Sequence, residues 1–145
     1  MTMAVRKTRN DKDFWYCMYD PTVKYILIDE NGNETGEVAP KYGEAIPFWA
    51  NVSPAIGQAQ FEQFGNLGNY DRVIVTRDMT CPVNETAVLF IDKQPEYKEV
   101  TAYEVIDGEI HGTVTYNLPM YDYIVKRVAI GLDAIAIAVS KVTVG

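Results

Sequence analysis

The sequence has twenty Asp and Glu side chains, but few histidine, serine or cysteine residues that could carry nucleophilic chemistry. The one histidine, His111, stands in "DGEIHGT" beside a predicted turn, where an exposed surface histidine is expected. The two serines, Ser53 and Ser140, lie outside any nucleophile-elbow pattern, so a serine–histidine pair would have to use His111. Cys17 and Cys81 are far apart and neighbour apolar or aromatic residues, which predicts two buried thiols without a disulfide or metal. We therefore expect no enzyme, no catalytic residue, no metal site and no cofactor.

The acidic and glycine-rich stretches do not form a recognisable site either. "DENGNETGE" has the residue types of a calcium loop but lacks the Asp-x-Asp-x-Asn-Gly frame, and the strand-like runs around it predict a hairpin tip. "GNLGN" does not open a helix after a strand, as a phosphate-binding loop would. A pair of carboxylates that meets only in the folded chain stays open.

Composition and charge narrow the class of protein. The chain has 145 residues, is 48% hydrophobic and 23% charged, and fits one soluble domain. Its net charge of −7 disfavours electrostatic binding to the phosphate backbone of a nucleic acid. The N-terminal arm, residues 1–12, is rich in basic residues: Arg6, Lys7, Arg9 and Lys12. This arm either docks on an acidic partner or is a solvated tail. The chain has neither a signal-peptide core nor an apolar run of membrane-spanning length, so we expect synthesis in the cytoplasm and no membrane partner.

The elements that must position these residues are predicted to be strands. Alternating and aromatic runs separated by turn signals about every ten residues are typical of an all-β barrel or sandwich. Asn31-Gly32 and Asp107-Gly108 predict two-residue hairpin turns, because these residue types accept positive φ. The strand-like runs before the C-terminal region are 13–19, 23–29, 37–52 (interrupted by Pro40 and Pro47), 71–78, 86–92 and the two arms of 99–116.

The C-terminal run, residues 121–144, predicts two further strands joined by a turn at residues 131–133. Ile135, Ile137 and Val139 alternate with alanines at a period of two, which favours a strand with small residues on its second face. Because alanine is a good helix former, a helix over residues 132–139 is the alternative.

One segment between two predicted strands is unusual. Residues 57–69, "GQAQFEQFGNLGN", are rich in Gln, Gly and Asn and carry one charge, although a hairpin needs only a few residues. We expect a long projecting loop, with a short helix over residues 58–64 as an option. Residues 96–118 form a possible inserted hairpin. The whole chain, 1–145, is thus predicted to be a single all-β domain, a small β-barrel or sandwich with a long projecting loop and an extended hairpin arm.

Six stretches, taken in order along the chain, match a known family: "RKTRNDKDFWYCMYD", "FWANVSP", "GQAQFEQFG", "DRVIVTRD", "TAVLFID" and "YDYIVKRVAIGLDAIAIAVSKV". In these stretches and their order the chain resembles the head-closure proteins of tailed bacteriophages, also called stopper or head–tail joining proteins, in the branch found in siphophages of Gram-positive hosts. The resemblance is weakest over residues 96–118.

This resemblance implies a structural protein of the virion neck, at the head–tail interface, assembled in the bacterial host cytoplasm. It implies a homo-oligomeric ring, twelve-fold, below the portal-adaptor protein and above the tail-terminator or tail protein. The ring closes the DNA channel after packaging, provides the attachment site for the tail, and lets double-stranded DNA pass without sequence-specific binding.

The resemblance also places the channel-closing loop in residues 57–69. Glutamine amides can bond across copies, glycines permit a change of backbone conformation, and the scarcity of Lys and Arg avoids a grip on DNA. The alternative is that Phe61 and Phe64 cap the barrel core while the glutamines are simply exposed. The predicted loop residues are Gly57, Gln58, Gln60, Phe61, Glu62, Gln63, Phe64, Gly65 and Gly68.

A second contact surface is predicted near the N-terminus. The aromatic residues there exceed what one strand face needs to bury, and aromatic side chains are enriched at interfaces. The residues expected to contact the adaptor ring or a neighbouring subunit are Arg6, Lys7, Arg9, Phe14, Trp15 and Tyr16.

Three other classes stay open on the sequence. A tail-terminator or tail-completion ring protein would carry a helix packed across a sheet. A stand-alone barrel that binds a small ligand would have an apolar cavity with convergent polar groups. A hydrolase would bring paired carboxylates with shifted pKa values into a cleft.

Overall fold

The computed structural model describes residues 11–54 and 70–142, and within these ranges the chain forms ten strands and no helix. The expected all-β fold is therefore confirmed. The strands are β1 (Asp11–Cys17), β2 (Tyr19–Ile28), β3 (Glu34–Tyr42), β4 (Ile46–Pro54), β5 (Arg72–Thr76), β6 (Val88–Phe90), β7 (Tyr97–Ile106), β8 (Glu109–Pro119), β9 (Tyr123–Ile130) and β10 (Ile135–Lys141).

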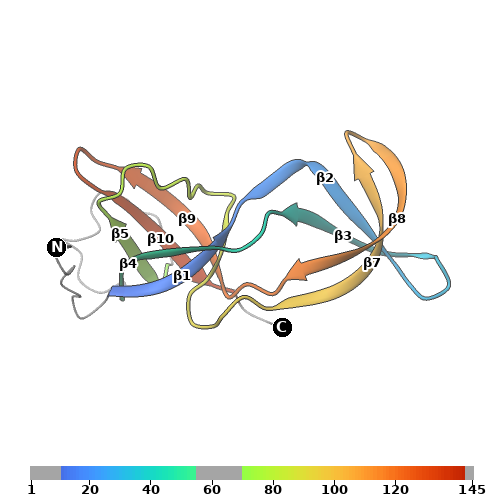
Figure 1. Ribbon diagram of the computed structural model, residues 1–145, viewed down its shortest axis with the longest axis horizontal. Coiled ribbons are helices and arrows are strands. Elements are labelled where there is room, and N and C mark those ends of the chain that lie inside the picture. The colour runs from blue at the N-terminus through green and yellow to red at the C-terminus, as the bar shows by residue number, and fades with distance from the viewer. Residues whose placement is uncertain (1–10, 55–69, 143–145) are drawn as a thin grey trace, which may run out of the picture.

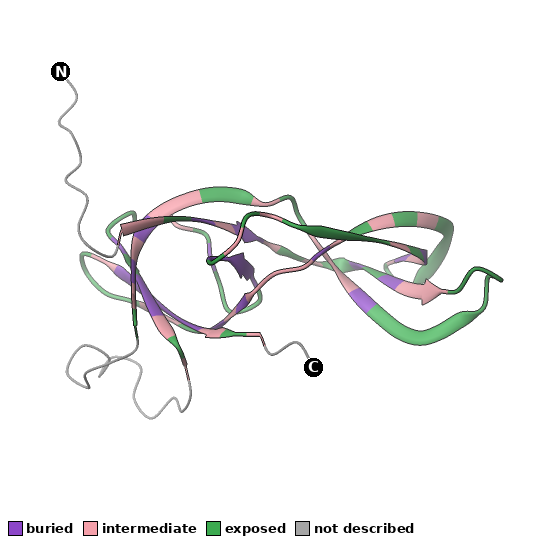
Figure 2. Ribbon diagram, turned by 90° about the horizontal axis from the view of Figure 1, so that it is seen from below, coloured by how far each residue is buried: buried purple, intermediate pink, exposed green. Residues whose placement is uncertain are grey.

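Six strands close into an antiparallel barrel in the order β1-β4-β5-β10-β9-β6 (Figure 1). β1 pairs with β4 along one edge and with the short β6 along the other, which closes the ring of strands seen in Figure 2. Inward side chains from all six strands fill the barrel, with Phe14, Ile74, Leu89 and Ile137 fully buried. The barrel interior is therefore a packed core of the size that six strands can enclose.

The C-terminal region forms the two strands that its alternation predicts, and the helix alternative is wrong. Ile135, Ile137 and Val139 point into the barrel core. Ala136 and Ala138 pack on the opposite face of β10 against Val73 of β5. The turn between β9 and β10 is held by the Gly131 amide, which donates to the Ala134 carbonyl at 2.9 Å.

The other four strands form a second antiparallel sheet in the order β3-β2-β7-β8, which extends from the barrel on the right of Figure 1. It consists of two hairpins, β2–β3 and β7–β8, joined through the pairing of β2 with β7. The possible inserted hairpin of residues 96–118 thus corresponds to β7 and β8. Together with β2–β3 it makes the extended arm of the fold.

The two predicted hairpin turns differ in length. Asp107 and Gly108 both have positive φ, 51° and 85°, and form the two-residue turn expected between β7 and β8. In the loop between β2 and β3, Gly32 has positive φ, 81°, whereas Asn31 does not. There the Asp29 amide donates to the Asn33 carbonyl and the Gly32 amide to the Asp29 carbonyl, so the loop has three residues, 30–32, instead of the predicted two. The Asp29 carboxylate accepts two amide hydrogen bonds in this loop, which favours the longer turn.

The second sheet curls so that its two edge strands, β3 and β8, approach each other. Tyr25 of β2 stacks on Tyr116 of β8 with ring centroids 4.0 Å apart. The Tyr42 amide of β3 donates to the Tyr116 hydroxyl at 3.1 Å. Buried side chains on the concave side, including Val23 and Ala102, give this sheet a small core separate from that of the barrel.

Candidate functional site

The described residues that border residues 1–10 and 55–69 meet at one end of the barrel. β1 begins at Asp11, opposite Asn51 of β4. β4 ends at Pro54, opposite Arg72 at the start of β5. The base of the N-terminal arm and both bases of the predicted loop therefore lie on three adjacent strands, β1, β4 and β5.

A single carboxylate connects these bases to the far side of the barrel. Asp92 follows β6, and its Oδ1 accepts a hydrogen bond from Lys12 Nζ at 2.9 Å and another from Arg72 Nη1 at 2.8 Å. Its Oδ2 accepts one from the Tyr123 hydroxyl at 2.9 Å. The Arg72 guanidinium carbon also lies 5.4 Å from the centre of the Tyr123 ring, within cation–π range. We call Lys12, Arg72, Asp92 and Tyr123 the Asp92 network.

Asp122, just before β9, holds Asp92 in place. Its two carboxylate oxygens accept the Ile91 and Asp92 amides, each at 2.8 Å. Its own amide donates to the Leu89 carbonyl, and its carbonyl accepts the Val142 amide at 2.8 Å. The chain after β6 is thereby fixed in the turn that points the Asp92 carboxylate at Lys12 and Arg72.

The protonation states in the network are fixed near neutral pH. Burial alone would raise the pKa of Asp92, but hydrogen bonds from Lys12 and Tyr123 and the charge of Arg72 outweigh it and lower the pKa below its usual 3.8. Burial, and then the hydrogen bond to Asp92, raise the pKa of Tyr123 to about 12. Asp92 is therefore ionised and Tyr123 protonated at neutral pH. The network thus stabilises this end of the barrel through charge-assisted hydrogen bonds and is not suited to proton transfer.

Most of the residues that the sequence singled out for function lie outside the described residues. This applies to all the predicted loop residues between Gly57 and Gly68, and to Arg6, Lys7 and Arg9 of the arm.

The aromatic residues of β1 have a different placement from the one expected. Phe14 is 0% and Tyr16 6% exposed, and both point into the barrel core, so neither offers its side chain to a partner. Trp15 points to the opposite face and is half-buried against Cys17, Val88 and Phe90. β1 carries aromatics on both faces because it lies between the barrel core and a second cluster at the junction with the other sheet.

The cysteines and the histidine offer no reactive centre. Cys17 is buried, and burial raises the pKa of its thiol to about 11. Cys81 is half-buried instead of buried as expected, and burial raises its thiol pKa as well. His111 is exposed on β8, next to the Asp107-Gly108 turn.

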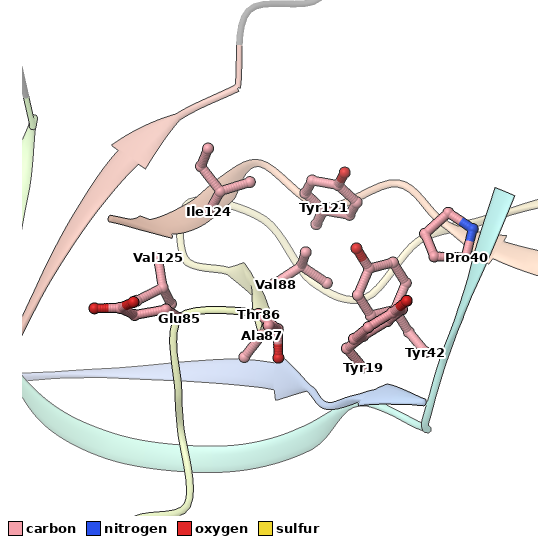
Figure 3. Close-up of a pocket in the computed structure, with 10 residues that line it drawn as sticks. All are labelled: Tyr19, Pro40, Tyr42, Glu85, Thr86, Ala87, Val88, Tyr121, Ile124 and Val125. Atoms are coloured by element: carbon pink, nitrogen blue, oxygen red, sulfur yellow. The ribbon is translucent and has the colours of Figure 1, made fainter. Parts of the chain in front are cut away.

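A hollow of about 390 Å³ opens where the barrel meets the second sheet (Figure 3). Tyr19 and Tyr42 lie together at its sheet end, with ring centroids 6.0 Å apart, and Tyr121 lies 6.0 Å from Tyr42. Burial, and then the neighbouring Tyr121 and Tyr116, raise the pKa of Tyr42 to about 12. Ile124 and Glu85 lie toward the barrel end of the hollow. Its lining is mostly aromatic and apolar, and Glu85 is the one carboxylate among the described residues that line it.

Sequence reasoning missed the Asp92 network and the tyrosines of this hollow. Asp92 stands in "FIDK", and Arg72 in "YDRV", and neither stretch differs from an ordinary strand end. Their partners are far along the chain, because Lys12 and Asp92 are 80 positions apart. The one sequence signal that could have pointed to the hollow is the large number of tyrosines, ten in the chain.

Neither the search for metal-binding and membrane-spanning features nor the comparison with known proteins identifies a function. Among the described residues, no group of three or more His, Cys, Asp or Glu side chains could hold a metal ion. The part of the chain that the structure describes also has no helix long and apolar enough to cross a membrane. Searches against protein-family models, curated proteins and solved structures find no match for this chain.

Proposed function

We propose that this chain is a structural, non-catalytic subunit of the neck of a tailed bacteriophage. In this role, copies of the chain form a ring below the portal adaptor, which closes the DNA channel after packaging and receives the tail. The observation that carries the proposal is the Asp92 network, because it ties the base of the N-terminal arm and one base of the 55–69 segment to the same carboxylate on one small barrel.

A channel-closing device needs a fixed base for the segment that closes the channel. β4 and β5 are neighbours in the barrel, and Pro54 lies opposite Arg72, so a few residues would suffice to join them. The chain instead inserts residues 55–71, whose glutamines and glycines suit contacts between identical copies. Because residues 57–69 contain no Lys or Arg, they would not bind the phosphates of passing DNA electrostatically.

The competing functions have less support. A ligand-binding barrel would keep a cavity inside the barrel, whereas the inward side chains of the described strands fill it. A tail-terminator protein would be expected to carry a helix across a sheet, and the described residues form none.

The test is genetic and structural, in the phage that encodes the chain. A null mutant should produce free tails and heads that lose their packaged DNA, and the protein should be found in wild-type virions at the head–tail junction by electron microscopy with a tagged copy. A protein absent from purified virions, or a null mutant with normal tailed particles, would overturn the proposal. Deleting residues 58–68 should leave folded subunits in the particle but allow DNA to leak.

A further inference from the structure

The charge of this protein is concentrated on the second sheet. Residues 19–44 and 96–119 carry eleven acidic and three basic side chains, a formal charge of −8, whereas the whole chain has −7. The barrel and the remaining segments are therefore close to neutral in sum. In contrast, residues 1–10 carry Arg6, Lys7 and Arg9 and no acidic residue. The acidic sheet and the basic arm are complementary parts of the same chain.

The acidic sheet also offers a place for an extended segment to bind. A hollow of about 300 Å³ lies between β3 and β8, with Leu27, Val38, Pro40, Leu118 and Met120 in its lining and Glu37 at its border. We call it the β3–β8 hollow. Val38 is 59% exposed, unusually high for a valine within a strand. The hollow is thus an apolar surface on a negatively charged element.

Both strands that border this hollow are edges. In the described part of the chain, β3 pairs only with β2, and β8 only with β7. Edge strands present unpaired amide and carbonyl groups that can accept an added strand. An extended segment placed in the hollow could therefore pair with β3 or β8 while its alternate side chains enter the apolar lining.

From these observations we infer that the β3–β8 hollow binds the N-terminal arm of a second copy of this chain. In extended conformation Met3 and Val5 lie on one side of the arm, two residues apart, as an apolar pair that suits this lining. By the same alternation Lys7 and Arg9 continue on that side and Arg6 lies on the other, so the bound arm would bring three positive charges to the acidic sheet.

The direction of β1 favours a neighbouring copy over the chain's own hollow. β1 begins at Asp11, at the end of the barrel away from the second sheet, and runs toward that sheet (Figure 1). The Lys12–Asp92 ion pair fixes this start. An arm leaving Asp11 must reverse to reach its own hollow, whereas the hollow of a copy placed head to tail lies ahead of it. A head-to-tail contact of this kind forms a ring if its rotation closes and a filament if it does not.

The experiment uses full-length variants and measures their mass by sedimentation velocity and native mass spectrometry. The arm variant is R6E/K7E/R9E, and the hollow variant is V38R. The matched control is I110R, because Ile110 is 64% exposed and lies on β8 of the same sheet without lining the hollow. Circular dichroism and thermal melting check that each variant is folded.

The wild type should associate in a concentration-dependent way, and 0.5 M NaCl should weaken the association because it screens surface charges. The arm and hollow variants should each associate at least tenfold more weakly, whereas I110R should match the wild type. A mixture of the arm and hollow variants should form a 1:1 pair and nothing larger, since one intact arm and one intact hollow remain.

Several outcomes would overturn the inference. One is a wild type that stays monomeric at all concentrations, including the case in which the arm folds back on its own hollow. Another is an equal loss of association in I110R and V38R, which would mean general charge attraction. These results are independent of the phage role, because they concern self-association alone; a protein that associates in this way and is absent from virions would refute only the proposed function.

Discussion

Replacing Asp92 with Asn tests whether the Asp92 network braces the barrel end. The amide keeps one oxygen acceptor and nearly the same size, so the change removes the charge without opening a cavity. It removes the ion pairs with Lys12 and Arg72 and weakens the hydrogen bond from the Tyr123 hydroxyl. The matched control is D133N, in the exposed turn between β9 and β10.

The size of the effect follows from the burial of the partners. Lys12, Arg72 and Asp92 side chains are each roughly one-third exposed, so each ion pair is worth only ~0.2–1 kcal/mol. A hydrogen bond to a charged group contributes ~1.5–3 kcal/mol against ~1 kcal/mol for a neutral one, so the weakened Tyr123 bond loses about 1 kcal/mol. We expect D92N to lower the free energy of unfolding by about 1.4–3 kcal/mol in total, which corresponds to a fall in Tm of roughly 3–12 °C for a chain of this size.

The pH dependence gives the sharper test. The folded-state pKa of Asp92 is lowered, so its contribution to stability is fully present above the usual pKa of 3.8 and is lost as the pH falls through the folded-state value. Urea unfolding followed by circular dichroism should show the same deficit for D92N at pH 7 and pH 5, and a smaller deficit at pH 3. If D92N unfolds like D133N at pH 7, or if its deficit does not shrink at pH 3, the network does not brace the barrel.

Two further comparisons test the fold itself. I137A should lower the free energy of unfolding by ~2–5 kcal/mol, because Ile137 is fully buried in the barrel core, whereas L132A should change it by less than ~0.5 kcal/mol, because Leu132 is 97% exposed in the adjoining turn; equal effects in urea titrations would contradict the barrel. G108A should cost about 1–2 kcal/mol, because Gly108 has φ +85° and a Cβ is disfavoured there. G43A should be neutral or slightly stabilising, because the nearest atom to its new Cβ would be the Met18 carbonyl oxygen at 3.8 Å; a thermal melt that ranks the two glycine variants in the opposite order would refute the turn assignment.

The sequence determined the parts of this fold that depend on neighbouring residues. The alternation of Ile135, Ile137 and Val139 with alanines identified β10 and its inward face, because side chains in a strand alternate between the two faces. Asp107 and Gly108 fixed a two-residue turn, because both residue types accept positive φ. Where a local interaction competed, as when Asp29 accepted extra amide hydrogen bonds at the β2–β3 turn, the predicted loop was one residue too short.

Only the tertiary structure decided which strands pair and which side chains meet. Alternation with a period of two residues shows that a strand has two different faces, but it does not show what covers each face. Phe14 and Tyr16 were therefore assigned to a contact surface, although β1 lies between β4 and β6 and buries both in the barrel core. Lys12 and Tyr123 reach Asp92 through pairs of strands that are far apart in the sequence, β1 with β6 and β6 with β9, so nothing near Asp92 in the sequence marks them as its partners. The same non-local pairing, of β2 with β7, joins two separate hairpins into one acidic sheet.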